Sequence, residues 1–254
     1  SAAIQQAIDA AAAQPGGGLV FLPAGRHRIT RTLFIWPGVR VFGVGRTRPV
    51  LLLAPNTPGF QRGVGNMVFF AGNNPHGTAT GANGVAMRGK VPVPPPTSVP
   101  FNDGIADANS GTFYSALANI DFEIGEGNPA ATGVRQHTAQ HTYLAHVDFR
   151  LGSALAGIYQ GGNLGMNLRF FGGRYGILAE KNSPAWQYTL LDSSFDGQRD
   201  AAIREHEMSL TMVNTAIRNT PVGVEIDRGY GERLWGSDVR FENVSQAGVV
   251  ISNE

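Results

Sequence analysis

The sequence predicts an all-β fold, a right-handed parallel β-helix (solenoid) with an N-terminal capping α-helix. Three observations predict it: an alanine-rich amphipathic start, short apolar runs punctuated by Gly and Pro after residue 14, and a segment that repeats after residue 112. A repeat of about 20 to 25 residues with two or three short strands cannot enclose a core alone, so it stacks on copies of itself.

The N-terminal helix is expected over residues 1–14. Ser1 stands at an N-cap position, Ile4, Ala7 and Ile8 form an apolar stripe, and "QPGGG" stops the helix. An open solenoid end exposes strand edges and apolar core, so we expect this helix to cover it.

The chain of 254 residues is expected to form one β-helix domain, 1–254. Residues 15–60 supply the first coils, 61–112 read as a long loop or insertion rich in Gly, Asn and Pro, and 113–254 form regular coils. Because both ends read as interrupted structure, we expect the chain to be a fragment of a longer protein.

The repeat aligns on a small residue that precedes an apolar one. The aligned segments are "ATGVRQH", "LAGIYQG", "RYGILAE", "DAAIREH", "PVGVEID" and "QAGVVIS". The small residues are Gly133, Gly157, Gly176, Ala202, Gly223 and Gly248, at intervals of 24, 19, 26, 21 and 25 residues. Each unit carries a second strand, such as "LAHVDFRL". Leucine-rich repeats share this period, but their Leu and Asn pattern is missing.

Side chains alternate along a strand, so the second and fourth residues after the small one should point outward, opposite the apolar first residue. The second positions are Arg135, Tyr159, Leu178, Arg204, Glu225 and Val250. The fourth positions are His137, Gly161, Glu180, His206, Asp227 and Ser252. Cations, rings and carboxylates on one flat face suit an extended sugar chain.

The third position should point inward, yet it holds Gln136, Gln160 and Glu205. Either the strand has ended there or these residues form an internal network; in the first case the Gln pair could hold a water in a cleft. Glu180 and Asp227, two coils apart, would lie roughly 9 to 10 Å apart at the backbone. Inverting glycosidases place their carboxyls roughly 6.5 to 9.5 Å apart.

Composition excludes several classes of function. The net charge of +1 and 15% charged residues give no nucleic-acid footprint. No run approaches the roughly 20 apolar residues of a membrane span, so we expect no membrane partner. Cysteine is absent, which removes thiolate ligands and disulfides. We expect no metal and no cofactor.

Beyond these patterns, "AAIQQAIDAA", "GGLVFLPAGRHRI" and "GVRVFGVGR" closely resemble the cap and first coils of the pectate-lyase-like superfamily, which includes rhamnogalacturonases and glycoside hydrolase family 55. Residues 113–149 and 157–177 look like the first β-helix of the family 55 exo-β-1,3-glucanases. The resemblance implies two β-helical domains side by side, a cleft between them, inversion at the anomeric carbon and a general acid in the second domain.

The chain departs from the family 55 pattern at the position of its His-Trp-Gln, where this sequence reads Arg135, Gln136 and His137. Over the following residues only Ala139, Gln140 and Thr142 match. Gln140 joins the expected substrate-binding set on this match.

We therefore predict an inverting glycoside hydrolase acting on a polysaccharide or oligosaccharide, with a β-1,3-glucan-like substrate and a secreted or periplasmic location. A second β-helical domain, of the same chain or another protomer, would complete the cleft. The expected catalytic residues are Glu205, Asp227, Gln136 and Gln160. The expected substrate-binding residues are Arg135, His137, Gln140, Tyr159, Glu180, Arg204, His206 and Glu225.

Two alternatives stay open from the residues. A polysaccharide lyase acting on uronates could use Arg135, Arg204 and His206 to neutralise a carboxylate and take a proton. A noncatalytic glycan-binding or tailspike-like solenoid would bind without turnover.

Overall fold

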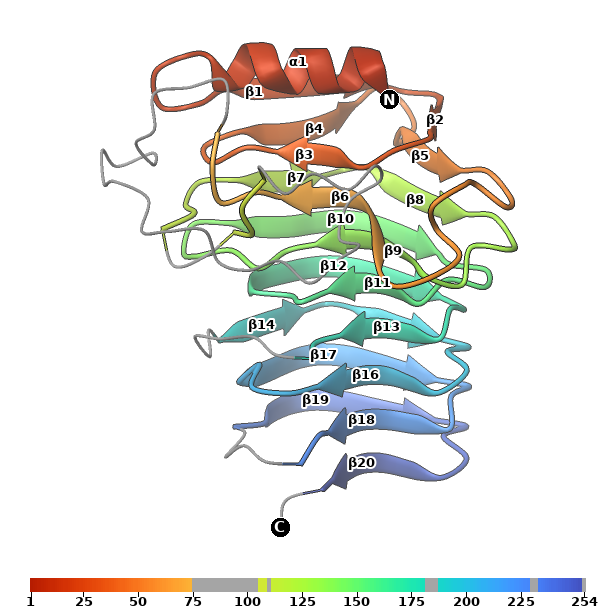
Figure 1. Ribbon diagram of the computed structural model, residues 1–254. Helices are drawn as coiled ribbons and strands as arrows, with labels where there is room; N and C mark the ends of the chain where they lie inside the picture. The colour runs from red at the N-terminus through yellow and green to blue at the C-terminus, as the bar shows by residue number, and fades with distance from the viewer. Residues whose placement is uncertain (75–104, 109–110, 181–186, 229–232, 253–254) are drawn as a thin grey trace.

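The protein is a parallel β-solenoid closed at its N-terminal end by one helix (Figure 1). A computed structural model describes residues 1–74, 105–108, 111–180, 187–228 and 233–252. Every pairing between its named strands is parallel, and the strands lie in two sheets of 12 and 8 strands. We call the larger one sheet A and the smaller one sheet B. This is the predicted fold class.

The elements alternate between the two sheets along the chain. Helix α1 spans Ala2–Ala12. Sheet A holds β1 Leu19–Pro23, β2 Arg26–Ile29, β4 Arg40–Val44, β5 Val50–Leu53, β7 Ala116–Ala118, β8 Asp121–Ile124, β10 Tyr143–Arg150, β12 Asn163–Phe171, β14 Tyr188–Leu191, β15 Ser194–Asp196, β17 Leu210–Arg218 and β19 Trp235–Glu242. Sheet B holds β3 Leu33–Ile35, β6 Gly65–Phe70, β9 Ala131–Arg135, β11 Ala156–Tyr159, β13 Tyr175–Leu178, β16 Ala201–Glu205, β18 Val222–Ile226 and β20 Ala247–Ile251.

The predicted repeat corresponds to the strands of sheet B. Their first positions after the small residue pair in the order Val134, Ile158, Ile177, Ile203, Val224 and Val249, and the first five are fully buried. Sequence intervals as different as 19 and 26 residues therefore end in one straight column, because loops outside the strands absorb the difference.

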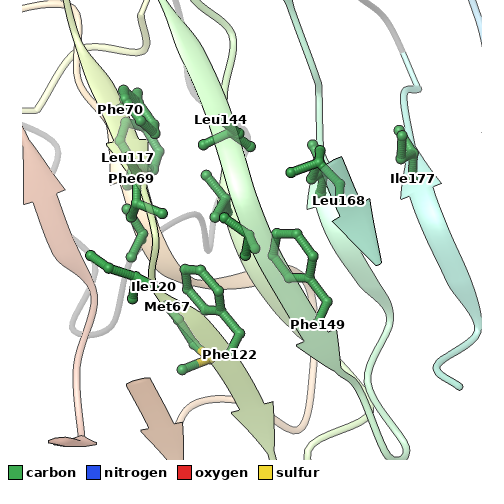
Figure 2. Packing of buried hydrophobic residues seen from close by; sticks show 14 of the residues in the cluster. Met67, Phe69, Phe70, Leu117, Ile120, Phe122, Leu144, Phe149, Leu168 and Ile177 are labelled. Carbon is green, nitrogen blue, oxygen red and sulfur yellow. The ribbon is translucent and has the colours of Figure 1, made fainter. Parts of the chain in front are cut away.

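The small residues of the repeat are required by aromatic rings of sheet A. Phe122, Phe149, Phe170 and Phe195 stack face to face inside the solenoid, with centroids 5.0, 4.9 and 4.5 Å apart (Figure 2 shows Phe122 and Phe149). A Cβ added at Gly157 would come within 2.7 Å of Phe170, and one at Gly176 within 2.4 Å of Phe195. These glycines have no room for a side chain.

One of the aligned small residues within the repeat is not a glycine, and the matching position among the stacked rings is not a phenylalanine. Ala202 is the one alanine among the aligned small residues, and in that coil Ile217 takes the place of phenylalanine in register with Phe195 and Phe241. The smaller side chain of Ile217 leaves room for the methyl group of Ala202, so the packed volume stays about the same.

Helix α1 covers the first coil, as predicted, through Ile8 and Ala12, which are buried. Gln5 and Asp9 attach it to the edge of β3: the Phe34 amide donates to Gln5 Oε1 at 2.8 Å and the Trp36 indole donates to Asp9 Oδ1 at 2.7 Å. Two details differ from expectation. Ala7 is exposed, and the Ser1 hydroxyl accepts from the Thr30 amide instead of capping the helix.

The segment 61–112, predicted to be a loop, contains strand β6, which lies in sheet B between its end strand β3 and β9. The four residues "MVFF" are all buried, and this short run was hidden by the Gly, Asn and Pro around it. Residues 105–108 also belong to the packed structure, whereas 75–104 lie outside the described residues. Within the described ranges, no helix has the length and apolarity for a bilayer crossing.

Candidate functional site

The candidate site lies on the outer face of sheet B, where the predicted second-position column is present. Arg135 pairs with Tyr159, Tyr159 with Leu178, Leu178 with Arg204, Arg204 with Glu225, and Glu225 with Val250. Parallel neighbours in a sheet lie about 4.8 Å apart, so side chains from 116 residues of sequence stand in one row. The row divides into a covered part and an open part.

In the covered part, Arg135 is buried against Asp107, a residue that sequence reasoning did not identify. Arg135 Nε and Nη2 donate to the two Asp107 oxygens at 2.9 and 2.5 Å, and His137 Nδ1 lies 3.2 Å from Asp107 Oδ2. Asp107 is held over the sheet by a single antiparallel bridge to Ala71. Residues 105–108 thus place the Asp107 carboxylate against Arg135 on the outer face of sheet B.

Burial would raise the pKa of Asp107, but the charge and hydrogen bonds of Arg135 hold that pKa below its usual range. Burial lowers the pKa of Arg135, but the charge and hydrogen bond of Asp107 raise it by more, so that pKa is raised overall. The two groups therefore stay charged and paired inside the protein. A buried pair of this kind contributes little net stability, but removal of one partner leaves an uncompensated buried charge.

Tyr159 continues the covered part. Its ring lies 5.0 Å from the Arg135 guanidinium carbon, and its hydroxyl donates to Glu180 Oε2 at 2.5 Å. Burial and the hydrogen bond to Glu180 raise the pKa of Tyr159, so the phenol keeps its proton. Glu180 is itself exposed and marks the rim of this part.

The open part of the column is centred on Arg204. Its Nε lies 3.1 Å from Asp227 Oδ1, its Nη1 donates to the Tyr175 hydroxyl at 3.4 Å, and its Nε is 3.9 Å from Glu225 Oε2. The hydrogen bond to Tyr175, together with Asp227 and Glu225, raises the pKa of Arg204 against a smaller lowering by burial. The side chains of Arg204, Glu225 and Asp227 are 37, 33 and 25% exposed.

Tyr175 connects this group to a neighbouring ion pair. Its hydroxyl donates to Asp200 Oδ2 at 3.2 Å, Asp200 accepts from Arg174 Nε at 2.5 Å, and the Arg174 guanidinium lies 5.3 Å from the Tyr175 ring. We call Arg174, Tyr175, Asp200, Arg204, Glu225 and Asp227 the open cluster. The Tyr175 ring itself is buried, at 3% exposure, so the groups that can bind sugar hydroxyls are the exposed guanidinium and carboxylate groups around it.

Of the third-position residues, Glu205 ends β16, is fully buried and is in register with the core residue Ile226. Strands β9 and β11 end one residue before Gln136 and Gln160, so the strand has ended at the Gln pair. Both glutamines are buried. Asp227 is the one member of the expected catalytic set with an accessible carboxylate.

The remaining expected residues do not form one site. His137 is buried beside Asp107, His206 is half-buried, and Gln140 is exposed in the turn between β9 and β10. That turn is fixed by Thr138 and Thr142, whose hydroxyls lie 2.6 Å apart. Leu178 separates the covered part from the open cluster within the column.

The sequence analysis did not predict Tyr175 and Asp107, and a pattern in the sequence marks only the first of them. Tyr175 stands one residue before the small residue of its repeat, in register with Ala156 and Ala201, so the same alignment would have placed it beside the column. Asp107 lies in the irregular segment and no pattern marks it. No group of three or more potential metal-ligating side chains occurs among the residues that the structure describes.

The two-sheet parallel solenoid with its N-terminal helix is a β-helix of the pectate-lyase-like class. Over residues 1–250 the sequence matches the family described as rhamnogalacturonase A/epimerase, pectate lyase-like. The protein belongs to this family.

Solved structures that resemble the chain include the A-module of the mannuronan C-5 epimerase AlgE4 from Azotobacter vinelandii, with a TM-score of 0.41 and 15% identity over 100% of this chain and 68% of that one. PfbA, a surface adhesin of Streptococcus pneumoniae, matches with a TM-score of 0.37 and 10% identity over 98% of this chain and 87% of that one. No curated protein sequence matches.

Proposed function

We propose that the protein is a polysaccharide-acting glycoside hydrolase that takes a neutral glycan, such as a β-1,3-glucan, across the outer face of sheet B. The observation that carries this proposal is the open cluster. It combines an accessible carboxylate, Asp227, a guanidinium that positions it, Arg204, and a buried tyrosine, Tyr175, whose hydroxyl accepts a hydrogen bond from Arg204. The family 55 resemblance of residues 113–177 supports the same reaction class.

The charge of the open cluster favours a neutral polymer. It contains two arginines, Arg174 and Arg204, and three carboxylates, Asp200, Glu225 and Asp227. Each guanidinium already faces a carboxylate, so the cluster has no spare positive charge for a uronate. A neutral chain can exchange its hydroxyl hydrogen bonds with water for those of the cluster without an electrostatic penalty.

In the proposed reaction Asp227 acts as the base. Arg204 stabilises its ionised form, which accepts a proton from a water that attacks the anomeric carbon. The glycosidic oxygen takes its proton from an acid on a second β-helical domain, of the same chain or another protomer. Inversion follows because the water attacks the face opposite to the leaving group.

A uronate-specific lyase is the second candidate, and one contact favours it. Arg204 lies 3.4 Å from the Tyr175 hydroxyl, which pairs a cation that could bind a carboxylate with a phenol that could transfer a proton. Cleavage would then form an unsaturated product. A noncatalytic glycan-binding protein would use the same face without turnover.

The test is incubation of the full-length protein with a panel of glycans that includes β-1,3-glucans and polygalacturonate. We expect new reducing ends of inverted anomeric configuration and no absorbance at about 235 nm, the region of unsaturated uronates. An increase in that absorbance would favour the lyase, and binding without products would favour the adhesin-like alternative.

Variants assign the roles. Asp227→Asn should abolish turnover with folding intact, whereas Glu242→Gln, which changes a carboxylate in the Arg218 pair on sheet A, should not. Glu205→Gln tests the buried carboxylate: full activity in this variant would remove Glu205 from the mechanism. Unchanged turnover in Asp227→Asn would contradict the proposal.

We also propose a secreted or periplasmic location, since polysaccharides are encountered there. Fractionation of the source cells checks it: recovery of the protein in the culture fluid or periplasm is expected, and recovery in the cytoplasm alone would contradict it.

A further inference from the structure

A second row of outward side chains crosses sheet A. Phe42, Ala118, Ala145, Met166, Leu191 and Val213 pair with one another in this order through six successive coils. We call them the apolar stripe; Phe21, in register with Phe42, extends it to the first coil and is 59% exposed. Leu190 and Met212, which precede Leu191 and Val213, belong to the core, so by strand alternation the stripe faces outward. Phe42, Met166, Leu191 and Val213 are half-buried, and the small Ala118 and Ala145 between them are buried.

Each of the last four stripe residues is followed by a polar residue with a left-handed backbone. His146, Asn167, Asp192 and Asn214 have φ values of 56, 49, 50 and 48° and are exposed. Asn167 Nδ2 lies 2.8 Å from His146 Nδ1, and Asn214 Nδ2 donates to Asp192 Oδ1 at 2.8 Å. This polar ladder is fixed in place along one border of the stripe.

The opposite border carries hydroxyl and amide groups at the same coil spacing. Thr189 and Thr211 are in register two residues before Leu191 and Val213. Gln187 Nε2 donates to both hydroxyls, at 3.2 and 3.4 Å. In the preceding coils the same position is held in turn by Leu164, Tyr143, Ala116 and Arg40. Preorganised hydrogen-bonding groups therefore border the stripe on both sides at Leu191 and Val213.

We infer that the apolar stripe and its borders bind a single extended chain of a neutral polysaccharide that runs along the solenoid axis. The C–H faces of the sugar rings would lie on the stripe and the hydroxyls would reach the two borders. This goes beyond the proposed reaction, which concerns the face of sheet B.

The dimensions decide between a polymer chain and a protein partner. Six strands about 4.8 Å apart make the stripe roughly 25 Å long, and two outward residues make it roughly 13 Å wide. The resulting few hundred Å² fall short of the roughly 800 Å² per partner of a stable protein interface. A long, narrow surface suits one polymer chain.

The charge decides between neutral and acidic polymers. Beside the last four stripe residues the two borders contain amides, hydroxyls, one imidazole and one carboxylate, Asp192, so this stretch offers no fixed cation to a uronate. Arg40 lies beside Phe42, at the far end of the stripe. Near the stretch itself, Arg169 is paired with Asp148 at 2.7 Å and Arg218 with Glu242 at 2.7 Å.

The test measures retention of the full-length protein on two insoluble neutral polymers, β-1,3-glucan and cellulose, at low temperature. Leu191→Glu places a charge in the stripe, and retention should fall at least about tenfold, because a buried charge has to be desolvated. Ser194→Glu is the matched control. Ser194 lies in the same coil as Leu191 but beyond Asp192, outside the stripe, and it is in register with the half-exposed Arg169. The variant therefore adds the same charge without placing it in the stripe. It should change retention less than about twofold.

Thermal unfolding of both variants checks that each is folded. Arg204→Ala, which alters the face of sheet B, should keep most of the retention, so that failure of the proposed hydrolase does not affect the result. The inference is overturned if neither polymer retains the unchanged protein, if both glutamate variants lose retention equally, or if Arg204→Ala alone abolishes it. It is also overturned if sedimentation shows that the unchanged protein is a dimer that Leu191→Glu dissociates.

Discussion

The two parts of one side-chain column on sheet B have opposite environments. Arg135 and Tyr159 are almost completely buried, and Arg135 is paired with a carboxylate that comes from a separate segment. Three coils further along, Arg204 is more than one-third exposed and pairs with carboxylates of its own sheet. Position in the repeat fixes the direction of a side chain, but the segments laid over the sheet decide whether it can meet a substrate.

The same ion-pair chemistry has different consequences in the two places. A buried pair interacts strongly, yet both charges have lost their water, so loss of one partner is costly. An exposed pair is screened and can exchange partners with a ligand. We therefore expect a structural role for the covered part and a binding role for the open cluster.

The largest expected effect is on the covered part. Asp107→Ala leaves the Arg135 charge buried without its partner, and the free energy of unfolding should fall by about 3 to 5 kcal/mol. Urea denaturation measures it. The double variant Asp107→Leu with Arg135→Met should recover much of this loss, since it removes both charges; a loss below about 1 kcal/mol in the single variant would mean that the covered part is open to water.

Substitutions of the repeat glycines test whether the core is packed equally tightly beneath the covered part and beneath the open part. A Cβ at Gly157, under the covered part, would lie 2.7 Å from Phe170, and one at Gly223, under the open part, 2.5 Å from Phe241. Each Gly→Ala substitution should cost about 1 to 3 kcal/mol by overpacking. Ala202→Gly, the reverse change in the same column, should cost at most about 1 kcal/mol.

Acid stability should depend on the covered part. The pKa of Asp107 is lower in the folded protein than in the unfolded chain, so its contribution is complete above the unfolded pKa of about 3.9 and is lost as the pH falls through the folded value. Urea denaturation between about pH 5 and pH 2.5 measures this. Asp107→Asn should lose less stability over this window than the unchanged protein; an identical pH dependence would contradict the pairing.

The smallest expected effect is on stability in the open cluster. Asp227→Asn should lower the free energy of unfolding by less than about 1 kcal/mol, because the Arg204 pair is exposed to solvent and screened. Added salt should reduce this difference further. A loss comparable to that of Asp107→Ala would show that the open cluster is structural.

Much of the fold was predictable because it follows from local rules repeated in each coil. The alignment of small residues placed all six members of the second-position column in the correct register. The rule works because a coil that slipped by one residue would place Val134 or Ile158 in water and Arg135 or Tyr159 in the core. The helix stop at "QPGGG" is equally local.

The covered part was not predictable because it depends on contacts that no period encodes. Asp107 and the strand "MVFF" lie in a segment whose composition suggests a loop, and their partners are remote in sequence. The solvent exposure of the column was therefore predicted wrongly, because a side chain that points outward was assumed to be accessible. Consequently Arg135, His137 and Tyr159 were grouped with Arg204 and Glu225, although only the latter two are open.

The division of the column into a covered and an open part can be tested in one binding assay. Titration of the full-length protein with an oligosaccharide of the glycan that it acts on, monitored by calorimetry, would be repeated with Arg204→Ala and with Tyr159→Phe. We expect at least about a tenfold weaker affinity for Arg204→Ala, as for a lost charge-assisted hydrogen bond, and less than a twofold change for Tyr159→Phe. Weaker binding by Tyr159→Phe with unchanged binding by Arg204→Ala would contradict this division.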